Sequence, residues 1–218
     1  MGFRTGWKAR ITAAALLCVG VGTHADGQEV RVLVYNSAKV RDGVLSKAGR
    51  ETGRIFRAAG VHLTWINCTG RGTSGECAFQ QQGPELILHI IPKGKASTDS
   101  VYGEAFLAED GEGKYADVFY DRIEEARRDM DAEPSMLLGA VAAHEIGHLL
   151  LGLRAHSWTG IMAPVWKKES FQELQMGHLF FNRDQALQLR QRSEDDDSRM
   201  ANRLSRKGTN VAGANGNP

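Results

Sequence analysis

The chain has 218 residues, of which 42% are hydrophobic and 24% are charged, proportions that are typical of a soluble globular protein. They exclude collagen-like, low-complexity and wholly disordered classes, and the length is that of one domain or at most two. Lys and Arg number 27 against 26 Asp and Glu, a net charge of +1, so no basic excess indicates a nucleic-acid partner.

The N-terminal segment is predicted to be an export signal. An apolar run over residues 11–21 precedes small residues that favour cleavage after Ala25. This run is too short and too rich in glycine to span a bilayer comfortably, and an uncleaved anchor is the alternative. We expect residues 1–25 to be a signal peptide and the remaining chain to be periplasmic or secreted, without a membrane span. Three basic residues precede the apolar run: Arg4, Lys8 and Arg10.

Removal of residues 1–25 leaves two cysteines, Cys68 and Cys77. An even pair in an exported protein favours a disulfide bond. The segment between them is polar and rich in turn-forming residues, as expected of a loop closed at its base. Two reduced cysteines are the alternative interpretation.

The first half of the exported chain is predicted to hold one helix and five strands. Residues 42–59 carry apolar side chains close to helical spacing, and Gly60 follows as a stop signal. Because the fourth strand is short and contains glycine, we expect it at an edge of the sheet. The predicted strands cover residues 29–35, 61–66, 85–91, 101–107 and 115–120.

The second half is predicted to be helical. Residues 124–130 are interpreted as a helical turn or a loop, and residues 136–151 as the strongest helix of the chain. A final helix is predicted over residues 181–192, with Asn182 as its N-cap. Residues 193–218 are charged and then rich in Gly and Asn, so we expect a disordered tail. This order predicts one α/β (α+β) domain over residues 26–192.

The strongest chemical signal is His-Glu-Ile-Gly-His, which starts at His144 on the strongest predicted helix. At 3.6 residues per turn, His144 and His148 lie on one face and can bind one metal ion through their imidazoles. Glu145 borders that face and can take a proton from a water molecule that the metal activates. A structural, salt-bridged cluster is the alternative, but a buried helix rarely keeps such residues without partners.

A catalytic zinc ion usually needs a third protein ligand, and His156 is the leading candidate. If the helix continued, His156 would lie about 12 Å along its axis from His148, so the chain must turn. Gly152 is where it can turn, because glycine accepts the left-handed conformation that ends helices. The alternative third ligand is Glu169 or Glu173, which are spaced one helical turn apart on a later segment.

The stretch that begins at His144 resembles the metzincin zinc peptidases, and within them the matrixins. In that family, H-E-x-x-H-x-x-G-x-x-H is followed by a tight turn that contains methionine. The resemblance implies that His144, His148 and His156 bind one Zn²⁺ ion. It further implies that Glu145 is the general base and that Met162, in Gly-Ile-Met, is the turn methionine.

The resemblance also implies a metzincin-like catalytic domain, with a mixed, twisted sheet of about five strands, an active-site helix and a C-terminal helix. This chain departs from the family spacing, because three residues rather than two lie on each side of Gly152. The family's third ligand position falls on Arg154, which cannot bind a metal. We therefore expect a helix one residue longer and a loop one residue longer, which keep His156 within reach.

We therefore predict an exported, monomeric zinc endopeptidase with a peptide or protein substrate. The predicted edge strand, residues 101–107, would hold an extended substrate through main-chain hydrogen bonds. Two alternatives stay open: a zinc hydrolase that acts on a non-peptide amide of the cell-wall type, and a zinc-stabilised binding module without catalysis.

Trp158 and Trp166 flank Met162 and are expected to pack in the core, with a place along the cleft as the alternative.

Overall fold

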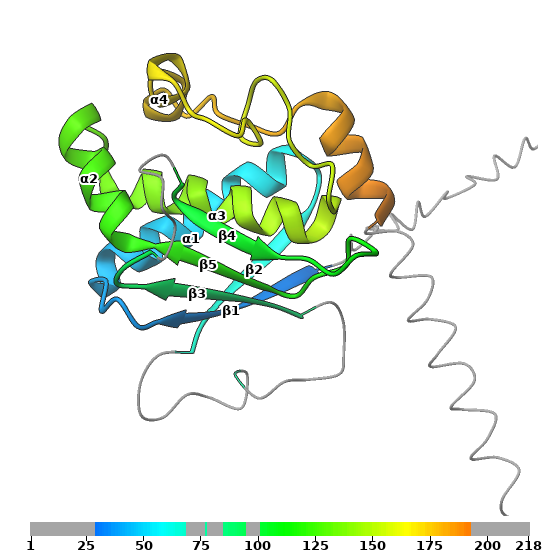
Figure 1. The fold of residues 1–218 in the computed structure, drawn as a ribbon, viewed down its shortest axis with the longest axis horizontal. Helices are drawn as coiled ribbons and strands as arrows, with labels where there is room; N and C mark the ends of the chain where they lie inside the picture. The colour runs from blue at the N-terminus through cyan, green and yellow to red at the C-terminus, as the bar shows by residue number, and fades with distance from the viewer. Residues whose placement is uncertain (1–28, 69–76, 78–84, 95–100, 193–218) are drawn as a thin grey trace, which may run out of the picture.

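The computed structural model describes residues 29–68, 77, 85–94 and 101–192. The predicted signal peptide and the predicted tail lie outside these residues. Within them the chain forms a five-stranded sheet with the strand order β2-β1-β3-β5-β4 (Figure 1). The strands are β1 (Glu29–Asn36), β2 (His62–Asn67), β3 (Glu85–Ile91), β4 (Gly103–Phe106) and β5 (Tyr115–Phe119).

The sheet is mixed. β1 pairs in parallel with β2 and β3, and β3 pairs in parallel with β5. β4 runs antiparallel to β5 and pairs with no other described strand, so it forms an edge. The predicted α/β class, the mixed five-stranded sheet and the edge position of the fourth strand are all confirmed.

Two long helices, α1 (Asp42–Ala58) and α3 (Pro134–Leu151), cover the same face of the sheet (Figure 1). They approach each other closely at Gly139, where an added Cβ would lie 2.6 Å from the Ala48 carbonyl oxygen. The buried Thr52 hydroxyl donates to the carbonyl oxygens of Ala48 and Gly139, at 3.0 and 2.9 Å. α3 is long and apolar enough to cross a membrane by length and composition, but most of it is buried, as in the core helix of a globular protein.

Three shorter helices complete the described chain. α2 (Tyr120–Met130) begins directly after β5. It is longer than the helical turn predicted over residues 124–130. α4 (Lys168–Gln175) is not among the predicted elements. The C-terminal helix covers residues 183–192, and its cap is confirmed, because the Asn182 side chain accepts a hydrogen bond from the Gln185 backbone N–H at 2.9 Å.

A disulfide bond joins Cys68, directly after β2, to Cys77, with a Cα–Cα distance of 5.6 Å. This pairing is the one predicted from the sequence. Cys68 is buried, so the bond holds Cys77 at the edge of the core beside the end of β2.

Candidate metal centre

α3 carries the first two histidines because its sequence makes a long, buried helix. Pro134 begins it, and the Glu133 carboxylate accepts a hydrogen bond from the Met136 backbone N–H at 2.9 Å. Most residues of α3 up to Leu150 are buried, including Glu145 at 4% exposure. His144 and His148 are partly exposed, so their imidazoles meet solvent where the core opens.

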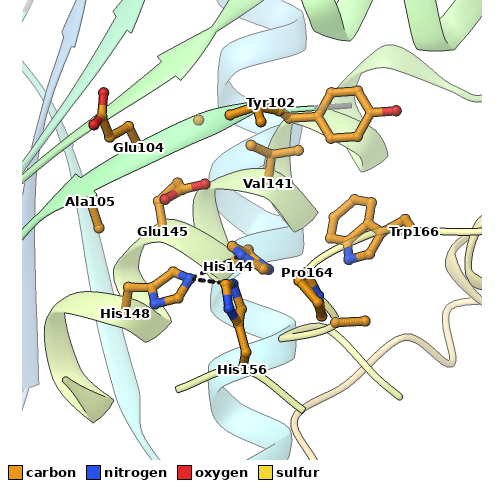
Figure 2. A pocket seen from close by; sticks show the side chains of 13 residues that line it. Tyr102, Glu104, Ala105, Val141, His144, Glu145, His148, His156, Pro164 and Trp166 are labelled. Atoms are coloured by element: carbon orange, nitrogen blue, oxygen red, sulfur yellow. Dashed lines mark hydrogen bonds between the residues drawn. The ribbon is translucent and has the colours of Figure 1, made fainter. Parts of the chain in front are cut away.

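Gly152 ends α3 and reverses the chain. Its backbone torsions, φ 80° and ψ −161°, are accessible almost only to glycine. Its N–H still donates to the His148 carbonyl oxygen at 2.9 Å, so the helix remains hydrogen-bonded up to the turn. The four residues that follow bring His156 back over α3 (Figure 2). The longer helix and longer loop that the altered spacing predicts thus place His156 at the site.

The three imidazoles converge on one point. His148 Nε2 lies 3.1 Å from His144 Nε2 and 3.1 Å from His156 Nε2, and the three ligand atoms lie within 4.8 Å of one another (Figure 2). Around a tetrahedral zinc ion with bonds of 2.0–2.1 Å, imidazole nitrogens lie about 3.3 Å apart. Two of the three spacings approach this value, so the cluster could hold a metal ion.

The tautomer of His144 is fixed by its other ring nitrogen. Nδ1 lies 2.7 Å from the Ile161 carbonyl oxygen, which can only accept, so Nδ1 carries the proton. In the neutral imidazole Nε2 then presents a lone pair to the other two histidines. A hydrogen bond of this kind orients metal-binding histidines in general.

Burial holds the imidazoles neutral. Burial, and after it the neighbouring imidazoles, lowers the pKa of His148 to about 3. Burial, with a smaller effect of His156, lowers the pKa of His144 to about 4, although the hydrogen bond to Ile161 raises it. Burial also lowers the pKa of His156. At neutral pH the three rings are therefore in the form that binds a metal.

Glu145 has the opposite perturbation. Burial, and after it the charge of Glu104, raises the pKa of the Glu145 carboxyl to about 8. Glu145 lies between the imidazoles and β4, whereas the Glu104 side chain points away from them (Figure 2). A carboxyl with a strongly raised pKa beside three histidines is typical of a functional site rather than of a packing position.

Met162 is fully buried against α3. Gly147, one residue before His148, allows this contact, because an added Cβ there would lie 2.6 Å from the Met162 sulfur. The Ser157 N–H donates to the Met162 carbonyl oxygen at 3.0 Å, which closes the loop after His156. The turn formed by residues 160–162 therefore packs beside the histidines.

A pocket adjoins the three histidines, bounded by β4 and by the segment after Met162. Trp166 lines it and donates from Nε1 to the Ile161 carbonyl oxygen at 3.2 Å. Its ring centroid lies 6.1 Å from that of His144 and 6.0 Å from that of Tyr102. Trp166 thus takes the alternative place along the cleft, although part of it also packs on the core.

Other sequence expectations fare differently. Trp158 is fully exposed, at 101%, so the prediction that it packs in the core is wrong, because it stands in the turn that reverses the chain after His156. Glu169 and Glu173 are exposed on α4 and do not belong to the three-histidine group. Tyr102 and Gly103, which also line the pocket, are not among the predicted site residues, because their only signal in the sequence is the weak edge-strand pattern.

No model of a known protein family matches the sequence, and no curated protein is significantly similar to it. Among solved structures, the chain is similar to a zinc-dependent peptidase from Methanocorpusculum labreanum (strain Z), at 18% sequence identity and a TM-score of 0.48. The similarity covers 73% of this chain and 99% of that one. This likeness is too low to transfer a function, which has to come from the side chains of this chain.

Proposed function

We propose that this protein is an exported zinc-dependent endopeptidase of metzincin type. The observation that supports it is the convergence of three neutral imidazoles beside a buried carboxyl and a free sheet edge. Three protein ligands with an open fourth position are typical of catalytic rather than structural zinc sites. The disulfide bond is consistent with an oxidising compartment outside the cytosol.

His144, His148 and His156 would hold the ion. When bound, zinc supplies a Lewis acid that polarises a carbonyl group and lowers the pKa of a water molecule to near 7. The positive charge would also lower the pKa of Glu145 from about 8 and favour its carboxylate. Glu145 would then accept a proton from the attacking water and pass it to the leaving amine.

The substrate would bind as an additional strand on β4. This strand ends the sheet among the described residues, so one of its edges is unpaired. Residues 101–105 also line the pocket beside the histidines. An extended peptide on this edge would run past the metal centre, and main-chain hydrogen bonds would fix its register.

The decisive experiment is cleavage of a peptide library by the zinc-loaded protein, compared with Glu145→Ala. We expect Glu145→Ala to bind one zinc ion per chain with nearly unchanged affinity and to lose activity by about 10³-fold, the usual effect of removing a general base. A chelator should abolish cleavage by the wild type. Both outcomes follow from separate roles for the imidazoles and the carboxyl.

The matched control is Glu173→Ala, which removes an exposed carboxylate on α4. It should leave zinc affinity and cleavage unchanged, and a loss of zinc binding would restore the downstream glutamate as third ligand. If Glu145→Ala cleaves as well as the wild type, the proposal is wrong. Metal binding without cleavage of any peptide would favour the non-peptide amide hydrolase.

A further inference from the structure

β4 passes so close to α3 that one of its positions has no room for a side chain. An ideal Cβ added to Gly103 would lie 2.7 Å from Cγ of Glu145 and 2.7 Å from its Oε1. It would also lie 2.7 Å from the Asp117 carbonyl oxygen on β5. Real Cβ atoms do not approach other atoms so closely, so any larger residue must displace something here.

The strand register explains why this position faces the carboxyl. Gly103 pairs with Val118, which is fully buried on the face that the helices cover. The next residue, Glu104, pairs with Asp117 and therefore lies on the opposite face. Gly103 is thus directed toward α3, and it is buried there.

We propose that Gly103 is a positioning residue for Glu145. The missing side chain allows the carboxyl to lie between the imidazoles and β4, the strand proposed to hold the substrate. A methyl group at this position would push Glu145 away from β4, and no histidine atom is among its three nearest neighbours. The inference rests on the proposed function, because it assigns Gly103 a part in orienting the general base.

Other close glycines separate this effect from ordinary packing. Gly113 lies between β4 and β5, and an added Cβ there would meet the Phe106 carbonyl oxygen at 2.4 Å and Leu107 at 2.7 Å. A methyl group at Gly113 would therefore strain the same pair of strands, but Glu145 is not among its three nearest neighbours. Gly113→Ala is the matched control for general damage to this edge of the sheet.

The first test measures kcat, KM and zinc affinity of the zinc-loaded protein. Gly103→Ala should lower kcat at least tenfold, because a misplacement of about 1 Å can cost 10²-fold in rate. Zinc affinity and KM should stay within about threefold, since the imidazoles and the substrate strand keep their places. Gly113→Ala should lower kcat by less than threefold. A raised KM with unchanged kcat would overturn the inference, because β4 would then act on binding alone.

The second test is a double-mutant cycle in thermal stability, which needs no activity. Gly103→Ala should lower Tm in the wild type more than in Glu145→Ala, because truncation of Glu145 removes the two atoms that the methyl group would meet. Equal losses in both backgrounds would show that only the Asp117 carbonyl matters and would overturn the inference. If the wild type cleaves no peptide, the proposed function fails, while this cycle still decides whether Gly103 positions Glu145.

Discussion

Glu145 shows how strongly the surroundings of one residue set its chemistry. The side chain is 4% exposed, and its pKa is raised to about 8 by burial and by Glu104. Without a metal, the carboxyl of the folded protein therefore stays protonated up to about pH 8, whereas the carboxyl of the unfolded chain ionises near pH 4.5. The cation that the histidines can hold is what would turn it into a base.

This perturbation predicts a pH-dependent stability of the metal-free protein. Below about pH 4.5 both states are protonated, and the contribution of Glu145 to stability is fully present. As pH rises toward 8, only the unfolded state ionises, so this contribution is lost. We expect metal-free Glu145→Gln to gain stability over the wild type across pH 4.5–8, by a few kcal/mol. Denaturant unfolding of both proteins at several pH values measures the difference.

Zinc-loaded protein provides the control, because the cation favours the carboxylate and should flatten the difference. A stability difference that does not change with pH in the metal-free proteins would contradict the raised pKa. A constant offset between the two variants is expected from the amide itself and does not bear on the result.

For single residues, the sequence predicts members of the candidate site where their geometry depends only on spacing along the chain. His144, Glu145 and His148 could be assigned because one helical turn fixes their geometry. Gly103 could not be assigned, because its contact with Glu145 depends on how β4 passes α3. Tyr102 could not be assigned either, because its contact with Trp166 depends on the path of the chain after Met162. The exposure of Trp158 was equally hidden, because burial of an aromatic residue in a turn depends on the path of the loop.

At the scale of single elements, the end of α3 decides whether His156, the proposed third ligand, reaches the other two histidines. The helix is predicted well because its apolar pattern and its motif agree. α2 and α4 are predicted poorly, since each buries only two residues, too few for a clear periodicity: Ile123 and Ala126 in α2, and Phe171 and Leu174 in α4. The turn at Gly152 was anticipated from the need to bring His156 back, although its torsions were not.

We predict that Gly152→Ala weakens zinc binding. Space is available, because the nearest neighbour of an added Cβ is the Gly111 carbonyl oxygen at 3.5 Å, but φ 80° with ψ −161° strains any L-residue by about 1–3 kcal/mol. Relief of that strain would shift the loop that carries His156. We expect the zinc dissociation constant to rise about tenfold or more, as measured by competition with a chromogenic chelator.

Gly43→Ala is the appropriate comparison. Gly43 lies in α1, an added Cβ meets nothing within 4 Å, and alanine is the better helix former. This variant should keep its zinc affinity and be at least as stable as the wild type. Unchanged zinc affinity in Gly152→Ala would show that His156 does not depend on the backbone of this turn.

At the scale of the whole molecule, the disulfide and the candidate metal centre lie at opposite edges of the sheet. The disulfide follows β2 at one edge, and the three histidines lie beside β4 at the other. The edge position of β4 could be anticipated from its short, glycine-containing pattern, whereas the strand order could not. The placement of the helices on one face could not, because it depends on how the crossover connections pack.

This separation predicts that the disulfide affects stability and not the site. Cys68→Ser with Cys77→Ser should lower the free energy of unfolding by about 2 kcal/mol, as expected for a short closed loop. Zinc affinity should remain within about twofold of the wild type. Calorimetry of both proteins, with and without zinc, measures the two quantities, and a parallel loss of zinc affinity would refute the separation.

The Ile161 carbonyl oxygen accepts hydrogen bonds from both His144 and Trp166. One atom therefore joins a histidine of the candidate metal centre to the wall of the pocket. A ligand that moved the indole would change the hydrogen bonding of this carbonyl oxygen and with it that of His144, and linkage would make the effect reciprocal for a metal ion held there. A compound that tightens zinc binding by some factor is itself bound more tightly by the same factor when zinc is present. If the three histidines hold a metal ion, occupancy of the pocket and occupancy of the metal centre would be coupled through this one carbonyl oxygen.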